Sequence, residues 1–292
     1  MLTYERSNTM KKVLAAALAC LLTFAAGCAD NGPATTPSSG TTLPTSHPTS
    51  GTTTPTTKPI MDPDVYSEQF NKHGVWYLRV SEEIWWDIEV PIFFLSYPDI
   101  KLSDRHTQGQ AAVAEDLRHR VDDFLSNKDE WVANAADWST TDQGFIGHDA
   151  SFTITSLVED EDRQIICVQY HISTFLGGPH GNYTYYDLTY DRETGEILML
   201  DDIIDTEKAD VLYQKLCDAL PTDVEYTQEP EPIIKEEFFT DLSKTDIWYF
   251  GNDGLHFNFN TYVLAPHAYG PINVVIPYNE LTDILLPQYM PQ

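Results

Sequence analysis

Histidines are the first side chains to consider for chemistry, and two of them stand in loops rich in glycine and proline. The chain has nine histidines, and none belongs to a His-Glu-x-x-His or His-x-His metal motif. His180 follows a Gly-Gly-Pro turn, and His267 lies in the stretch Ala-Pro-His-Ala-Tyr-Gly. If these two rings and a carboxylate converge on one pocket, the arrangement would suit a cell-wall hydrolase or deacetylase accessory protein. Otherwise each histidine is a hydrogen-bonding element of its loop, and we expect neither a metal nor a cofactor.

Other signatures of catalysis are missing from the sequence. It contains no Gly-x-Ser-x-Gly nucleophile motif and no Ser-x-x-Lys pair. Asp and Glu are so frequent that neighbouring carboxylates carry no information about glycosidase chemistry. The acidic stretches Glu159–Asp162 and Asp191–Glu196 lack the ligand spacing of an EF-hand loop. We therefore expect that the protein is not an enzyme.

The net charge restricts the partners. With 45 Asp and Glu against 17 Lys and Arg, the formal charge is −28 at pH 7. Such a surface repels the phosphates of nucleic acid, so we expect no nucleic-acid partner. It attracts cationic proteins, although the same charge could serve only to keep an exported protein soluble.

The N-terminus predicts export and lipidation. Lys11 and Lys12 precede the apolar stretch Val13–Ala26, which is typical of a signal peptide. The stretch ends in Ala-Ala-Gly before Cys28 and resembles the lipobox of bacterial lipoproteins, with Met10 as the natural start. We therefore expect residues 1–27 to be removed and Cys28 to carry the lipid that anchors the protein on the extracytoplasmic side of the cell membrane. An ordinary cleaved signal with an incidental cysteine is the alternative.

Composition divides the rest of the chain. Residues 28–61 contain a long run of Thr, Pro, Ser and Gly, which has too little apolar surface to order itself, so we expect a disordered tether. Residues 62–292 have the composition of a folded protein. We expect two intimately associated subdomains, one over residues 62–150 and one over residues 151–292.

The folded part is predicted to be α+β, with antiparallel β-meander sheets and a few packing helices. Apolar patterning predicts strands in residues 84–98, 151–158, 163–173, 183–191, 196–200 and 272–278. Residues 248–260 are predicted to form a hairpin that turns at Asn252-Asp253-Gly254. Helices are predicted after the capping box at Thr107–Gln110, over 207–220 and over 233–239, with a last helical turn at 280–285. The stretch 131–146 is poorly patterned and is expected to be a loop. Cys167 and Cys217 could form a disulfide or remain two buried thiols.

A tyrosine-rich strand follows the Gly-Gly-Pro turn. Alternation places Tyr183 and Tyr185 on one face and Tyr186, Leu188 and Tyr190 on the other. Because both faces are aromatic, one is expected to pack inward. The other could contact a partner or simply complete the sheet.

The stretch Gly177–Ile204, with its Gly-Gly-x-His, tyrosine strand, Asp-x-x-Thr-Gly and Leu-x-Asp-Asp, resembles the extracellular domain of the anti-sigma factor RsiV. The C-terminal stretch 252–285 resembles the end of the same family at Tyr262, Ala265-Pro266, Gly270 and Ile276-Pro277-Tyr278. Residues 75–127 are similar to the companion domain found there and in PdaC-type peptidoglycan deacetylases. No Thr-Phe-Asp-Asp deacetylase motif is present.

This resemblance implies an α+β ectodomain without catalytic activity that binds lysozyme or a cell-wall component. Contacts specific to such a partner are expected from aromatic residues in loops and at the sheet edge. The candidates are His180, Tyr183, Tyr185, His267 and Tyr269.

Overall fold

The computed structural model describes residues 56–61, 74–85, 91–141, 147–244 and 247–291, all of which belong to one unit, Thr52–Gln292. The predicted signal peptide, Cys28 and most of the predicted tether lie outside the described residues. Within the described ranges, no helix combines the length and the hydropathy that a membrane span requires.

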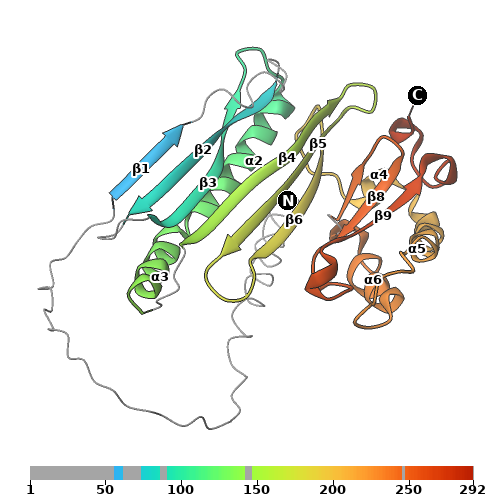
Figure 1. Cartoon of the computed structure of the whole chain (residues 1–292). Coiled ribbons are helices and arrows are strands. Elements are labelled where there is room, and N and C mark those ends of the chain that lie inside the picture. Colours follow the sequence, from blue (N-terminus) through green and yellow to red (C-terminus); the bar gives the residue numbers. More distant parts are fainter. Residues whose placement is uncertain (1–55, 62–73, 86–90, 142–146, 245–246, 292) are drawn as a thin grey trace, which may run out of the picture. The chain divides into compact units, whose positions relative to one another are not determined.

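A six-stranded sheet forms the first half of the fold, in the order β1-β2-β3-β4-β5-β6 (Figure 1). Its strands are β1 (Thr56–Met61), β2 (Val75–Trp85), β3 (Pro91–Leu102), β4 (His148–Asp160), β5 (Ile165–Phe175) and β6 (Asn182–Asp191). All neighbours are antiparallel except β3 and β4. The prediction of α+β is confirmed, but the sheet is mixed, because two helices carry the chain between β3 and β4 and let these strands run parallel.

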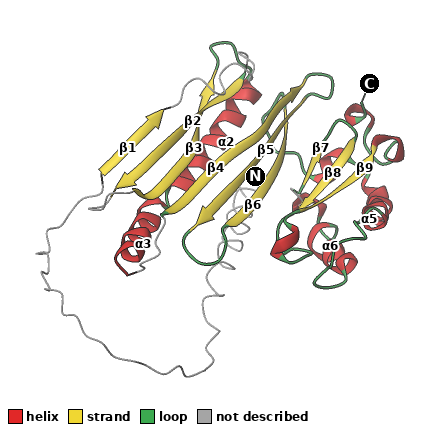
Figure 2. Cartoon of the chain, viewed as in Figure 1, coloured by secondary structure: helices red, strands yellow, loops and turns green. Residues whose placement is uncertain are grey.

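Those two helices are α2 (Gln108–Leu125) and α3 (Lys128–Thr141), and they pack on one face of the sheet (Figure 2). The predicted capping box is confirmed: the Thr107 side chain accepts from the Gln110 main chain, and the Gln110 side chain accepts from the Thr107 main chain. The expectation of a loop over 131–146 is wrong as far as Thr141. The Trp131 ring in α3 packs 5.1 Å from the Phe124 ring, so tertiary contacts stabilise a helix whose alanine-rich sequence shows little amphipathic pattern.

The second half is built on a three-stranded antiparallel sheet, β7 (Trp248–Phe250), β8 (Gly254–Phe259) and β9 (Ile272–Pro277). Helices α4 (Leu200–Ile203), α5 (Ala209–Asp218) and α6 (Pro230–Phe238) precede it, and short 3-10 turns occur at Thr206–Lys208, Leu242–Lys244, His267–Tyr269, Tyr278–Glu280 and Pro287–Tyr289. The predicted hairpin around Asn252-Asp253-Gly254 is confirmed. The predicted strand at 196–200 is reduced to one bridge between Tyr190 and Ile197, after which α4 begins.

Two hydrophobic cores share strand β5. Ile166, Val168 and Tyr170 face the core under α2 and α3, whereas the alternate residues Ile165 and Cys167 face the core of the C-terminal half. The boundary predicted at residue 150 therefore cuts through β4 of a continuous sheet, and the change from one core to the other occurs across β5 and after β6. Hydrophobic patterning around a strand cannot show that its two faces serve different cores.

One further expectation is corrected, and one open question is answered. The tether predicted for residues 28–61 ends earlier, because Thr56–Met61 pair with β2 as the edge strand β1; proline is tolerated at such an edge. Cys167 and Cys217 are both free thiols, which decides the open question against a disulfide. Burial raises the pKa of the Cys167 thiol to about 11, so it stays protonated at neutral pH.

Candidate functional site

Two of the predicted site residues, 87 positions apart in the sequence, meet in the fold. The imidazole rings of His180 and His267 stack with their centroids 4.1 Å apart and their planes at 21°. His180 stands in the β5–β6 loop and His267 opens the 3-10 turn before β9. The structure thus brings together two histidines that the sequence places only in similar loops.

Tyr262 completes this group. Its ring centroid lies 5.5 Å from that of His267, and its hydroxyl lies 3.5 Å from His180 Nε2. Tyr262 is 57% exposed and has a φ of 72°, a left-handed conformation that is uncommon for residues other than glycine. Such backbone strain is tolerated where the surrounding structure holds it, often at functional sites. We call His180, Tyr262 and His267 the ring cluster.

Glycines shape the loop that carries His180. Gly177 and Gly178 have φ values of 91° and 97°, and a Cβ on Gly177 would lie 3.2 Å from the Trp138 ring. A side chain at Gly177 would therefore be both strained and crowded.

Asn260 ties the C-terminal half to the edge of β6, close to the ring cluster. Its Oδ1 accepts from the Tyr185 main-chain N–H at 2.6 Å, and its Nδ2 donates to the Tyr185 carbonyl at 2.9 Å. The amide side chain thereby pairs with the edge strand as another strand would. The segment leading to Tyr262 is held beside the loop of His180 by these two bonds.

The other predicted candidates lie around the ring cluster to different degrees. Tyr183 is 47% exposed, and its ring packs against Gly181, next to His180. Tyr269 is also exposed and belongs to the same 3-10 turn as His267. Tyr185 is half-buried, and its ring lies 5.5 Å from that of His171, so it contributes to the sheet. Tyr262 was not predicted as a site residue; its place between two loops gives no sign of the ring contacts, which depend on the Asn260 bonds.

The condition set for a hydrolytic site is met only in part. The contacts of the two stacked imidazoles within the described residues are with each other, with Tyr262 and with the Gly181 carbonyl, and they include no carboxylate. No group of three His, Cys, Asp or Glu side chains in the described part of the chain could hold a metal ion. The arrangement offers flat rings and hydrogen-bonding nitrogens, which suit binding.

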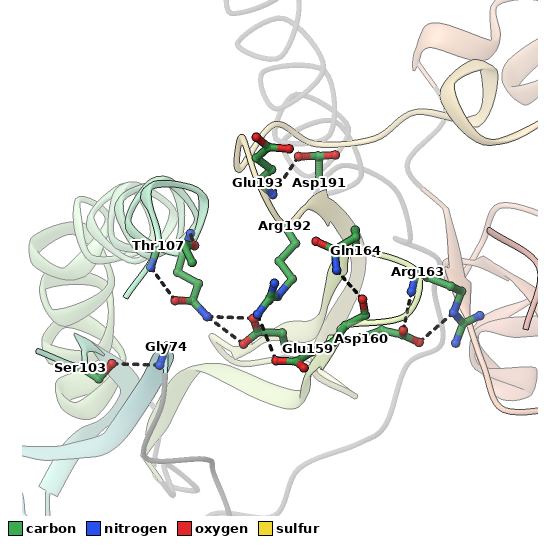
Figure 3. Close-up of polar contacts among 12 residues, drawn as sticks. Gly74, Ser103, Thr107, Glu159, Asp160, Arg163, Gln164, Asp191, Arg192 and Glu193 are labelled. Carbon is green, nitrogen blue, oxygen red and sulfur yellow. Dashed lines mark hydrogen bonds and ion pairs between the residues drawn. The ribbon is translucent and has the colours of Figure 1, made fainter. Parts of the chain in front are cut away.

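At the opposite end of the β5–β6 hairpin, charged side chains are paired (Figure 3). Both Glu159 carboxylate oxygens accept from Gln110 Nε2, at 2.8 and 2.9 Å, and one also accepts from Arg192. Arg163 donates to Asp160 at 2.8 Å and to the Tyr278 hydroxyl at 2.6 Å. This network joins the turns after β4 and β6 to α2 and to the C-terminal half.

A buried carboxylate lies between the two halves. Asp187 in β6 accepts from Gln169 Nε2 at 2.8 Å and from Asn258 Nδ2 at 3.0 Å. Burial raises the pKa of Asp187, and the two amide donors offset part of that shift. Its contacts are internal, so we assign it to the packing of β6 against β8.

Comparison with known proteins gives one family match, in the C-terminal half. Residues 201–279 match the model of a family described as "Protein of unknown function (DUF3298)". The matched range begins in α4 and ends in the turn after β9, so it contains His267 and Tyr262 but not His180.

Two of the solved structures that resemble this chain belong to DUF3298 family proteins. A crystal structure of a DUF3298 family member from Bacteroides fragilis is similar over 73% of this chain and 94% of its own, with a TM-score of 0.50 and 17% identity. A DUF3298 family protein from Pseudomonas aeruginosa covers 75% of this chain and 96% of its own, with a TM-score of 0.47 and 16% identity. A search of curated proteins gave no match. The Bacteroides likeness concerns the fold alone, and the finer resemblance to the RsiV ectodomain and the PdaC companion domain stays a prediction.

Proposed function

We propose that this protein is a lipid-anchored binding module of the cell envelope that recognises a protein ligand without catalysing a reaction. The observation that carries the proposal is the ring cluster, in which loops from both halves of the fold present His180, Tyr262 and His267 side by side. Exposed Tyr183 and Tyr269 flank it. Tyrosine is enriched at binding hot spots because its ring offers a large contact area and its hydroxyl a hydrogen bond.

The construction of the surface favours binding over chemistry. The side chains of the ring cluster come from loops held by glycine turns and by the two hydrogen bonds between Asn260 and the Tyr185 main chain, which we call the Asn260 clasp. A surface held in one geometry loses little conformational entropy when a partner docks. The ring contacts recorded above lack the carboxylate that would orient a histidine as a general base.

A basic protein is the partner class that the charge favours. The chain has a net charge of −28, so a cationic protein is drawn to it and binding weakens as salt screens the charges. The resemblance to the RsiV ectodomain makes lysozyme the first protein to test. A cell-wall component is the alternative ligand for the same surface.

The location of the protein is also part of the proposal. Cys28, preceded by Ala-Ala-Gly, would be acylated and would hold the folded part outside the cytoplasmic membrane through the Thr/Pro-rich tether. The variant Cys28→Ser is expected to move the protein from the membrane fraction into the medium. Retention of this variant in the membrane fraction would refute the anchor.

Calorimetry tests the binding function. The chain carrying Cys28→Ser is titrated with lysozyme at low and at moderate salt, and cytochrome c serves as a basic control protein. We expect saturable binding of lysozyme that weakens with salt and no comparable binding of the control. Absence of binding at low salt, or equal binding of both proteins, would remove lysozyme as the ligand.

A further inference from the structure

The strand register places one serine from each of four adjacent strands on a single line. Ser81 in β2 is paired with Ser96 in β3, Ser96 with Ser151 in β4, and Ser151 with Ser173 in β5. The line continues to Tyr183 in β6. Paired residues carry their side chains on the same face of a sheet, and the Oγ atoms of Ser151 and Ser173 lie 2.7 Å apart. We call these four residues the serine row.

The serine row lies on the face of the sheet away from α2 and α3. Leu95 and Phe152, which are the chain neighbours of Ser96 and Ser151, are buried in the core under those helices. Because successive side chains in a strand point to opposite faces, the serines point away from that core. At a spacing of about 4.8 Å between strands, the row is roughly 14 Å long.

Larger side chains rise on both sides of the row. Glu83, Phe94 and Asp149 each lie two residues from a serine of the row. Glu83 is paired with Phe94, and Phe94 is paired with Asp149. Arg79 stands on the other side of Ser81. These four side chains and Ser81, Ser96 and Ser151 line a cavity of about 380 Å³, which is in the range of small-ligand sites. Ser81, Ser96 and Ser151 thus form the floor of a groove that crosses β2, β3 and β4.

The groove contains unpaired charge and an exposed ring. Neither Glu83 nor Asp149 forms an ion pair with another described residue, and the Phe94 side chain is 42% exposed. Burial raises the pKa of Asp149, so a cation beside this carboxylate would relieve a cost that the free protein carries. One wall of the groove is therefore suited to a cationic group.

The main chain of this region takes no part in recognition. Strands β3 and β4 are paired on both sides over the length of the groove, so their N–H and C=O groups are used within the sheet. A peptide that binds by adding a strand needs a free edge. A ligand on this face must instead be recognised by hydroxyls, carboxylates and the Phe94 ring.

We propose that Ser81, Ser96 and Ser151 of the serine row form the floor of a binding groove for a linear oligosaccharide that carries amino groups. Serine hydroxyls both donate and accept hydrogen bonds, as sugar hydroxyls require. The Phe94 ring offers a flat apolar surface to one face of a sugar. Glu83 and Asp149 pair with the ammonium groups, as charge-assisted hydrogen bonds favour. The residues that line the groove belong to β2, β3 and β4, and none of them is in the ring cluster, so this proposal stands whether or not the protein binds lysozyme.

Titration with three sugars tests the groove. The whole chain carrying Cys28→Ser is titrated by calorimetry at mildly acidic pH with tetramers of glucosamine, of N-acetylglucosamine and of glucose. We expect the glucosamine tetramer to bind most tightly. Absence of binding, or equal binding of the glucose tetramer, would overturn the proposal, and so would equal binding of a lysine tetrapeptide, since the groove would then select only charge.

Variants locate the binding to this face. Asp149→Asn is expected to lower the affinity for the glucosamine tetramer about tenfold, because it removes a charged hydrogen-bond partner. Ser151→Val, which places branched methyl groups on the floor, should lower it similarly, with Ser81→Val as a second variant if Ser151→Val fails to fold. The control is Asp122→Asn, an exposed residue of α2 beyond the opposite face, and it should leave the affinity unchanged. If Asp149→Asn binds as the parent does, the groove is not the site.

Discussion

The two ends of the β5–β6 hairpin differ in what their side chains do. Arg163 precedes β5 and Arg192 follows β6, at the end that we call the turn end. There both arginines are paired with acidic partners, and Arg163 also contacts Tyr278 (Figure 3). At the other end, which carries the β5–β6 loop and which we call the loop end, the ring cluster is exposed to solvent. Tyr262 and Tyr183 are about half exposed there. The same pair of strands therefore has a stabilising network of ion pairs and hydrogen bonds at one end and a candidate binding surface at the other.

This difference separates stability from recognition. Charges that are satisfied inside the protein are not available to a ligand, and breaking them costs folding free energy. Exposed rings held by a few main-chain bonds contribute little to folding but much to a contact with a partner. Variants at the two ends should consequently affect different measurements.

Arg163→Ala should have the largest effect on stability. The substitution removes the bond to Asp160, the bond to the Tyr278 hydroxyl and the contact of the guanidinium with the Phe250 ring, 5.0 Å away. Since the side chain is only 15% exposed, we expect a loss of roughly 2–3 kcal/mol in the free energy of unfolding, measured by urea denaturation. Affinity for the partner of the ring cluster should stay unchanged.

Arg105→Ala is the matched control for that experiment. Arg105 is exposed, and its recorded hydrogen bond is made by its main-chain carbonyl, so its loss should change stability by less than about 0.5 kcal/mol. If the two arginine variants were equally stable, the contacts of Arg163 at the turn end would not stabilise the fold.

Asn260→Ala should have a smaller effect on stability but should affect both measurements. It removes the two bonds to the Tyr185 main chain, which we expect to cost about 1–2 kcal/mol. Because this clasp positions the segment of Tyr262, the affinity for the partner should also fall. Stability loss without any change in affinity would show that the ring cluster does not depend on the clasp.

The smallest effect is a difference in pH dependence between Asp160 and Asp149. Burial opposes ionisation of Asp160, but hydrogen bonds from the Arg163 main chain and side chain and the Arg163 charge lower the pKa of its carboxyl. Its stabilisation is present above the unfolded pKa of about 3.9 and is lost as the pH falls through the lower folded value. Burial instead raises the pKa of Asp149, so its contribution declines as the pH rises above about 3.9.

Replacing each carboxylate by an amide distinguishes the opposite effects that the two groups have on the pH dependence of stability. Relative to the parent protein, Asp160→Asn should lose stability at neutral pH and approach the parent in acid, whereas Asp149→Asn should gain stability as the pH rises. Solvent screening limits each change to roughly 0.5 kcal/mol. Urea unfolding between acid and neutral pH measures both changes. If the stability of both variants relative to the parent changed in the same direction with pH, the opposite roles assigned to Asp160 and Asp149 would be contradicted.

The sequence predicted the elements better than their assembly. The capping box at Thr107 and the turn at Asn252-Asp253-Gly254 are local, and both were predicted because their geometry depends on neighbouring residues. Helix α3 was missed because contacts such as that of Trp131 with Phe93 come from a distant part of the sequence. The parallel pairing of β3 with β4 likewise depends on where the two helices pack.

The candidate site was foreseen only as a list of residues. His180 and His267 were chosen for their loops, and their stacking follows from the packing of two halves that no local pattern describes. Tyr262 joined them only in the fold. The serine row was not predicted either, because the alignment of serines from four strands depends on register rather than on any single segment.

The most direct test of the account is the double variant His180→Ala/His267→Ala, compared with the parent in both urea unfolding and calorimetric binding of lysozyme. We predict a fall in affinity of at least about tenfold with a change in stability below about 0.5 kcal/mol. Unchanged affinity in a variant that is folded and saturable would contradict the claim that the loop end of the hairpin is the binding surface.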